Sequence, residues 1–353
     1  MSRTRELKTF EAIQEALDLC LAADPNVIVM GLGVPDPKGV FGTTVGLQKK
    51  YGAGRVFDTP TSENAMTGIA IGAALMGLRP VLSHQRVDFA LLSIDQIVSQ
   101  AAKWRYMFGG RQGVPLVIRL IVGRGWGQGP QHSQSLQSWF AHVPGLKVVM
   151  PATPHDAKGL LISAIEGGDP VVFIEHRWLH NSFGPVPEGL YRVPIGPARV
   201  ARGGKDLTIV AMSSMVPEAL KAAEVLAGQG VETEVIDLRT LRPFDAETVL
   251  ASVRKTGRLI VADTSWKLAG FGAEVVATVA EGAHAALKAA PVRFGLADCP
   301  APTSPPLAAR FYPRASDLVG AARRMLDFRE LTLPEPDADV PHDVPDRTFT
   351  GPF

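Results

Sequence analysis

The stretch Asp58–Ala74, which reads DTPTSENAMTGIAIGAA, sets one carboxylate at the start of an otherwise small and apolar segment. Residues 64–76 predict a helix, and Ser62 and Glu63 lie at its expected N-terminus. A carboxylate is ordinary at such a position, because it favours the free N–H groups and the helix dipole. The spacing alone therefore leaves two interpretations of Glu63 open: a helix-start residue, or a group that carries chemistry.

Strand and helix patterns alternate on both sides of this stretch. Apolar residues at helical spacing alternate with short apolar runs that end in glycines or polar turns. The expected helices are 9–23, 64–76, 91–106 and 156–165, and the expected strands are 27–30, 81–82, 116–122 and 171–175. Such alternation predicts a parallel sheet covered by helices on both faces.

A second α/β unit follows a break in this periodicity. Between residues 178 and 201 the pattern fails and four prolines accumulate, which indicates an irregular connector. From residue 207 to residue 295 strands and helices alternate again, so the predicted fold class is α/β with two parallel-sheet domains. The predicted divisions are a first domain at 1–185, a connector at 186–204, a second domain at 205–330, and a Pro- and Asp-rich tail at 331–353. The tail is too poor in apolar residues to form a core, and we interpret it as a disordered end rather than a partner-wrapping arm.

Composition narrows the class of partner. Among the 353 residues, 36 Lys and Arg nearly balance 35 Asp and Glu, so no global charge favours nucleic acid or an anionic membrane. Cys20 and Cys299 are far apart and neither has metal-ligand spacing, which argues against a disulfide or a zinc site. The first ten residues lack the apolar core of a signal peptide, and no apolar run approaches the length of a membrane span. We expect a cytoplasmic protein with small-molecule or protein partners.

The stretch Asp58–Ala74, with Gly77–Pro80 after it, resembles the beta subunit of the thiamine diphosphate-dependent, decarboxylating component of 2-oxo acid dehydrogenases. The resemblance continues in the same order over about residues 5–326. Further matching segments are Ile94–Val98, Ala101–Lys103, Tyr106–Met107, Gly109–Gly110, Val114–Arg119, His132–Gln134, Pro144–Pro151, Val235–Pro243 and Lys255–Leu259. The resemblance implies an oxidoreductase subunit with a transketolase-like pyrimidine-binding domain and a transketolase C-terminal-like domain, active as an alpha2beta2 heterotetramer.

The resemblance also implies roles for two residues around the cofactor. The glutamate at the position of Glu63 hydrogen-bonds a ring nitrogen of the aminopyrimidine, which makes the exocyclic amine acidic enough to take part in proton transfer from the thiazolium carbon. The aromatic residue at the position of Phe89 packs against the same ring and excludes water. Without the resemblance, the commoner interpretation of a lone phenylalanine such as Phe89 is core filler.

Two further residues are candidates for substrate contact. By resemblance, His132 in a glycine-rich loop faces the substrate end of the cofactor, where an imidazole could orient a carboxylate or shuttle a proton. His142 is a weaker candidate of the same kind. Arg177 lies in a loop expected at the pocket floor, where it could pair with a carboxylate or phosphate or be a solvated surface charge, and the sequence leaves both open.

The sequence lacks the motif that holds the diphosphate end of the cofactor. Thiamine enzymes typically use Gly-Asp-Gly followed later by Asn, whereas Gly168-Asp169 is followed here by Pro170. Asp169 therefore fits a turn before a strand, or a loop cation site. The resemblance implies that the Mg²⁺ ligands come from an alpha-type subunit and that this chain supplies none. A lipoyl-bearing acyltransferase is a possible further partner.

Three departures from the resembled family leave the reaction's acceptor open. Leu32-Gly33 stands where an acidic pair is usual, Asp263–Trp266 replaces His-Glu-Ala, and Pro300–Pro305 is similar to transketolase-like subunits outside the large complexes. The first hypothesis is decarboxylation of a 2-oxo acid with acyl transfer to a lipoyl group. The alternatives are a transketolase-like or acyloin-forming carbon–carbon transferase subunit and a non-catalytic assembly subunit. The side chain of the 2-oxo acid cannot be read from the residues.

Overall fold

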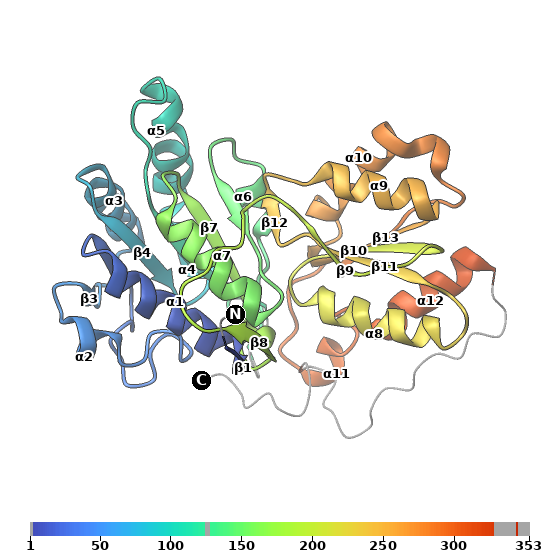
Figure 1. The fold of residues 1–353 in the computed structure, drawn as a ribbon, viewed down its shortest axis with the longest axis horizontal. Helices are drawn as coiled ribbons and strands as arrows, with labels where there is room; N and C mark the ends of the chain where they lie inside the picture. The colour runs from blue at the N-terminus through green and yellow to red at the C-terminus, as the bar shows by residue number, and fades with distance from the viewer. Residues whose placement is uncertain (1–2, 124–127, 328–343, 345–353) are drawn as a thin grey trace. The chain divides into compact units, whose positions relative to one another are not determined.

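The computed structural model describes residues 3–123, 128–327 and 344, and it divides into two compact units. The first unit contains residues 1–123 with 139–195, and the second contains 124–138 with 196–352. The division after residue 195 falls within the expected connector, while residues 128–138 group with the second unit instead of the first. Figure 1 draws the helices and strands of each unit. The predicted tail, apart from Val344, lies outside the described residues.

The first unit is built on a parallel sheet with the strand order β6-β7-β5-β4-β2-β3. Its strands are β2 (Val27–Met30), β3 (Val56–Phe57), β4 (Arg79–His84), β5 (Val117–Val122), β6 (Lys147–Val149) and β7 (Val171–His176). The strands are short apolar runs that are buried almost throughout, as expected when helices cover a parallel sheet. Parallel pairing brings the carboxyl ends of β4, β5 and β7 to one edge, where polar residues follow.

Helices occupy the intervals between these strands. They are α1 (Thr9–Ala23), α2 (Leu47–Tyr51), α3 (Glu63–Leu75), α4 (Val87–Ala90), α5 (Ala102–Met107), α6 (Gln137–Ala141) and α7 (Pro154–Glu166), with short turns η1 (Leu91–Ser93), η2 (Gln96–Ala101) and η3 (Arg177–Leu179). The single helix expected at 91–106 is instead divided into a 3₁₀ turn, a π-helix and an α-helix. The π-helix η2 places Gln96 close to Gly68 of α3, where an added Cβ would lie 3.4 Å from the Gln96 amide oxygen.

The main core of the first unit lies between the sheet and the helices α1 and α7. Val81 of β4, Val117 and Ile121 of β5, and Phe173 of β7 belong to this core. Because side chains alternate along a strand, Ser83 of β4 shares the face of Val81, whereas Leu82 and His84 point to the other face. The helix α3 packs on β4 and bears the stretch that decided the family resemblance.

Two strands form where the sequence predicted an irregular connector. β8 (Phe183–Pro187) pairs antiparallel with β1 (Thr4–Lys8), and β9 (Arg199–Arg202) pairs antiparallel with β11 of the second unit. The expectation of irregular structure at these residues was wrong. Pro185 and Pro187 are tolerated in β8 because the missing N–H of an edge strand need not join a ladder, and β9 begins after Pro197 and contains no proline.

The second unit has its own sheet, with the order β14-β13-β10-β11-β9. All pairs are parallel except that of the edge strand β9. Its remaining elements are β10 (Leu207–Ala211), α8 (Met215–Ala227), β11 (Thr233–Asp237), β12 (Thr240–Arg242), α9 (Ala246–Thr256), β13 (Leu259–Trp266), α10 (Phe271–Ala283), η4 (His284–Ala286), β14 (Val292–Leu296), α11 (Pro305–Ala308) and α12 (Ala315–Leu326). No helix in the described part of the chain is long and apolar enough to cross a membrane.

Candidate active site

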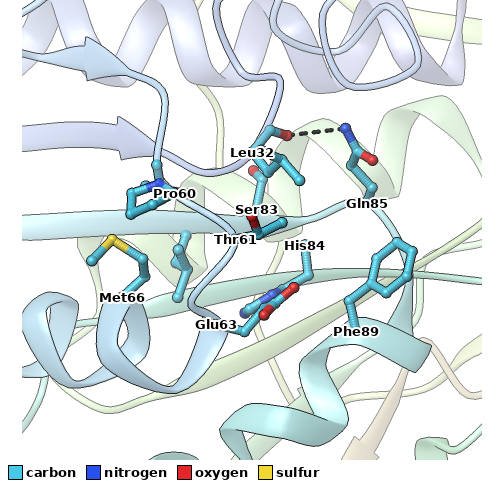
Figure 2. A pocket seen from close by; sticks show the side chains of 11 residues that line it. Leu32, Pro60, Thr61, Glu63, Met66, Ser83, His84, Gln85 and Phe89 are labelled. Atoms are coloured by element: carbon cyan, nitrogen blue, oxygen red, sulfur yellow. Dashed lines mark hydrogen bonds between the residues drawn. The ribbon is translucent and has the colours of Figure 1, made fainter.

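A pocket in the first unit lies between the start of α3, the end of β4 and the helix α4 (Figure 2). The enclosed part of the pocket is small, about 20 Å³, and the surrounding non-atom space, counted together with open solvent, is about 350 Å³. The lining residues are Leu32, Thr59, Pro60, Thr61, Glu63, Met66, Leu82, Ser83, His84, Gln85 and Phe89. The pocket thus combines one carboxylate, one imidazole and several apolar side chains, which is the composition expected of a small-molecule site.

Glu63 is the first residue of α3 and is half-buried at the pocket wall. The preceding N-cap residue, Ser62, makes no side-chain cap hydrogen bond. The two interpretations of Glu63 that the sequence left open are therefore compatible. The carboxylate stands at a helix start, and it also faces a space that a ligand could enter.

Phe89 lies in α4 and lines the same pocket. It is half-buried rather than part of the core, and Met66 and Leu82 add further apolar surface to the wall. The structure therefore brings together Glu63 and Phe89, the two residues that the sequence analysis assigned to one cofactor ring. The arrangement presents a carboxylate and an aromatic side chain to the same space.

Three pocket residues did not emerge from the sequence analysis as functional groups. The imidazole of His84 is buried, with 5% of its surface exposed, and no group in the described residues pairs with its Nε2. Burial lowers the pKa of His84 to about 4, so the ring is neutral at physiological pH. Gln85 donates a hydrogen bond of 3.1 Å to the carbonyl oxygen of Leu32. Leu32, one of the departures from the resembled family, is also part of the pocket wall.

A buried ion pair lies on the opposite face of the sheet. The Arg119 guanidinium donates to both carboxylate oxygens of Glu175, at 2.7 Å and 3.0 Å. It also donates to the hydroxyl oxygens of Ser83 at 3.1 Å and Thr43 at 2.8 Å. Nε2 of His180 lies 3.0 Å from the second Glu175 oxygen. These contacts hold the carboxyl ends of three parallel strands together.

Arg177 is a buried residue, with 4% of its surface exposed, in the turn η3 after β7. The interpretation of Arg177 as a solvated surface charge is wrong, because the side chain is buried. The sequence alone does not reveal that this turn is covered by other residues. Its guanidinium carbon lies 4.9 Å from the centre of the Phe41 ring, and that of Arg86 lies 5.3 Å from the same ring. Burial lowers the pKa of Arg177 to about 10, and the side chain still carries a positive charge at neutral pH.

His132 groups with the second unit, whereas Glu63 and Phe89 belong to the first. It is half-exposed, and its backbone N–H donates to the carbonyl oxygen of Gly129 at 3.2 Å. Its predicted role at the substrate end stays a prediction, as does that of the exposed His142. Residues 124–127 of the glycine-rich loop lie outside the described residues.

Asp169 is held by two cationic side chains. Arg105 and Lys147 both donate to its carboxylate, the latter at 3.1 Å. Burial raises the pKa of Asp169, but the hydrogen bonds from Arg105 and Lys147 outweigh burial and lower it below the usual value. This environment fits the turn interpretation better than a cation site. Among the described residues, no cluster of three or more His, Cys, Asp or Glu side chains could hold a metal ion.

Comparison with known proteins places this architecture in a family. Residues 5–181 match the transketolase pyrimidine-binding domain, and residues 196–318 match the transketolase C-terminal domain. The beta subunit of the pyruvate dehydrogenase E1 component from Bacillus subtilis is 44% identical over 324 residues, covering 92% of this chain and 99% of that protein. The chain belongs to the transketolase-like E1 beta subunits. Membership of this family confirms the predicted class, an oxidoreductase beta subunit, and implies dependence on thiamine diphosphate and an alpha-type partner.

Two further relatives extend the comparison. The beta subunit of acetoin:2,6-dichlorophenolindophenol oxidoreductase from Cupriavidus necator is 46% identical over 332 residues, covering 91% of this chain and 98% of that protein. A solved structure described as a split-gene transketolase in an inactive beta4 tetramer superposes with a TM-score of 0.74 and covers 91% of this chain and 99% of its own. At 24% identity, that structure supports the fold alone, and it confirms the predicted fold class.

Proposed function

We propose that this E1 beta-type chain supplies the aminopyrimidine half of a thiamine diphosphate site, in an enzyme that decarboxylates a 2-oxo acid and transfers the acyl group. The observation that carries this proposal is the shared pocket of Glu63 and Phe89, at the start of α3 and in α4. A carboxylate and an aromatic wall are what a protonatable heteroaromatic ring requires. The buried Nε2 of His84 in the same pocket, which has no partner in the part of the chain that the structure describes, also fits a ligand that brings hydrogen-bonding groups.

Each of the two residues has a distinct task. Glu63 binds a ring nitrogen and shares a proton with it, for which a carboxyl group is needed at the end of a side chain of this length. Phe89 orients the ring and keeps water from its face, with Met66 and Leu82 completing the apolar wall. When bound, thiamine diphosphate supplies a nucleophilic carbon that adds to a carbonyl group and stabilises the electron pair left by carbon dioxide.

The other half of the site belongs to a partner in this proposal. The sequence has no Gly-Asp-Gly motif, and Asp169 is already engaged by Arg105 and Lys147. An alpha-type chain would therefore bring the Mg²⁺ ligands and the diphosphate contacts, in an alpha2beta2 heterotetramer of closed symmetry. His132 and the buried Arg177 are the proposed substrate contacts of the beta chain. A lipoyl-bearing acyltransferase is the proposed acceptor of the acyl group.

A second candidate is cleavage of an acyloin such as acetoin. The observation that favours it is the 46% identity with the beta subunit whose name specifies acetoin and an artificial electron acceptor. Breaking an acyloin and decarboxylating a 2-oxo acid need the same electron sink, so Glu63 and Phe89 serve either reaction. The two functions differ in the leaving fragment, and hence in residues toward the substrate end.

The deciding experiment compares the purified chain alone with the chain co-expressed with its alpha-type partner. Isothermal titration of thiamine diphosphate, with and without Mg²⁺, should show tight magnesium-dependent binding in the assembly alone. Micromolar stoichiometric binding by the isolated chain would contradict the split site. Turnover with an artificial electron acceptor is then compared for pyruvate, branched-chain 2-oxo acids, acetoin and ketose phosphates. Exclusive turnover of acetoin would replace the first candidate with the second.

A further inference from the structure

The strand β4 ends in a histidine that faces the pocket. Val81 belongs to the core beneath α1 and α7, and the Ser83 hydroxyl accepts a hydrogen bond from Arg119 on that face. Alternation along the strand therefore directs His84 to the face of α3, where it lines the pocket with Glu63. Figure 2 shows the His84 side chain extending from the strand toward the start of α3.

Within the described part of the chain, one hydrogen-bonding atom of His84 has no partner. Its Nε2 is buried and has no partner among the described residues. Two neighbouring polar side chains have partners elsewhere: Gln85 donates to the carbonyl oxygen of Leu32, and the Ser83 hydroxyl accepts from Arg119. Buried polar atoms in native proteins nearly always have a partner, so a ligand that fills the pocket is the natural source of one.

Other buried atoms without a partner do not share this position. Nδ1 of His180 also lacks a partner among the described residues, but His180 is not part of the pocket wall. His84 is buried, its Nε2 has no partner among the described residues, and its side chain lines the pocket. A neutral ring offers one N–H donor and one acceptor nitrogen, which suits a ligand edge that carries both kinds of group.

We propose that His84 is a cofactor-binding residue whose imidazole hydrogen-bonds a polar atom of the aminopyrimidine other than the nitrogen that Glu63 takes. This inference rests on the proposed function, because it assumes that the aminopyrimidine enters this pocket. The ring carries two nitrogens and an exocyclic amine, so one hydrogen bond to Glu63 leaves a donor and an acceptor. His84 would fix the rotation of the ring about its bond to the rest of the cofactor, and it is thereby also a positioning residue.

The test uses the assembly of this chain with its alpha-type partner and measures the Kd of thiamine diphosphate by isothermal titration. His84→Phe keeps a planar ring but removes both nitrogens, and the Kd should rise about five- to tenfold, the range of one ordinary hydrogen bond. His84→Gln retains a donor and an acceptor, and its Kd should stay within about twofold of the parent value. His155→Phe is the matched control, because His155 stacks on Tyr191 and does not line the pocket.

A cofactor analogue separates hydrogen bonding from shape. In an analogue with an unsubstituted benzene ring, which lacks both ring nitrogens and the exocyclic amine, no hydrogen bond to His84 is possible, so this analogue should lose no affinity when His84 is replaced by Phe. If His84→Phe does not assemble, the smaller His84→Leu takes its place in both titrations.

Equal Kd values for the parent and the apolar variant with thiamine diphosphate would overturn the role of His84. An equal loss with the benzene analogue would show that only shape matters, and would overturn it as well. Failure of the proposed function is distinguishable, because the parent assembly itself would then bind no thiamine diphosphate.

Discussion

Ser83 and His84 are neighbours on β4, yet they face two different kinds of polar environment. On the side of Ser83, each nitrogen of the Arg119 guanidinium donates to a protein oxygen, and both Glu175 oxygens are bound. On the side of His84, a buried ring nitrogen has no partner in the described residues and adjoins a pocket. The Arg119 guanidinium, whose nitrogens all donate to protein oxygens, joins neighbouring strands, whereas the open imidazole nitrogen of His84 at the pocket is where we propose that a ligand binds.

The two regions also differ in charge: the Glu175 carboxylate is ionised, whereas the His84 imidazole is neutral. Burial raises the pKa of Glu175, but the charge of Arg119 and the contact with His180 outweigh it and lower the pKa to about 2. The ion pair is therefore permanently charged over the physiological range. For His84, burial is the cause that lowers the pKa, and it keeps the ring neutral. The Arg119–Glu175 ion pair thus links neighbouring strands. The imidazole of His84 instead lines a pocket, and its Nε2 has no partner among the described residues.

The largest expected effect is on chemistry at the pocket. Glu63→Gln should lower turnover of the assembled enzyme roughly 10²–10⁴-fold, because an amide cannot share a proton with the cofactor ring. Folding should be unchanged by circular dichroism and thermal melting. Glu247→Gln is the matched control, since Glu247 is likewise a first-turn glutamate, on the exposed surface of α9. Turnover of Glu63→Gln within a few-fold of the parent would remove Glu63 from the site.

The next effect is on stability. Arg119→Met leaves the Glu175 carboxylate buried without its cation and should cost about 3–5 kcal/mol of unfolding free energy, measured by urea denaturation. A double variant, Arg119→Met with Glu175→Leu, should recover most of that loss, because it removes the buried charge as well. If the single variant is as stable as the parent, the ion pair is not what holds these strands together.

A smaller effect concerns acid stability. The pKa of His84 is about 4 in the folded chain against its ordinary value of 6.5, so well above pH 6.5 the ring is neutral in both states and contributes nothing. As the pH falls from 6.5 toward 4, the unfolded state takes up a proton first and the folded state loses stability, by about 2 kcal/mol at pH 5. His84→Phe should lack this loss, so its stability relative to the parent should improve between pH 7 and pH 5. Parallel pH profiles for the two proteins would contradict the neutral, buried ring.

The smallest effect tests a residue outside both regions. His132→Ala should lower turnover about tenfold while the Kd of thiamine diphosphate stays unchanged, because its proposed contact is with substrate. The exposed His284, on η4, gives the control His284→Ala. A weaker cofactor affinity with normal turnover at saturation would mean that His132 belongs to the cofactor site instead.

Much of this arrangement could be predicted from the sequence because it depends on local pattern. Alternating apolar runs and helical spacing gave both α/β units, and Glu63 was visible as a lone carboxylate in a small, apolar stretch. The edge strands β8 and β9 were missed because the prolines in and near them predicted irregular structure, and the alternation of apolar and polar residues in these strands is weak. Domain limits stay predictions, although residues 124–138 group with the second unit.

The buried polar groups were harder to predict, for a physical reason. Arg119 and Glu175 are 56 residues apart, and their pairing follows from strand order rather than from any local signal. Arg119 in the centre of the buried strand VIRLIV was a usable hint, since a charge there requires a partner. The expected strand at 81–82 was too short to include His84, so the alternation that places it in the pocket could not be applied.

The alternation on β4 also limits how this chain can change during evolution or engineering. Because side chains alternate with a period of two, inserting or deleting one residue in β4 would exchange the two faces. The imidazole would then meet the Arg119 guanidinium, and a hydroxyl would replace it at the pocket. Substitutions at Ser83 and His84 can be made one at a time, but insertions or deletions in β4 must come in pairs, and the segment before it, Gly77–Leu78, is where a compensating length change could be absorbed.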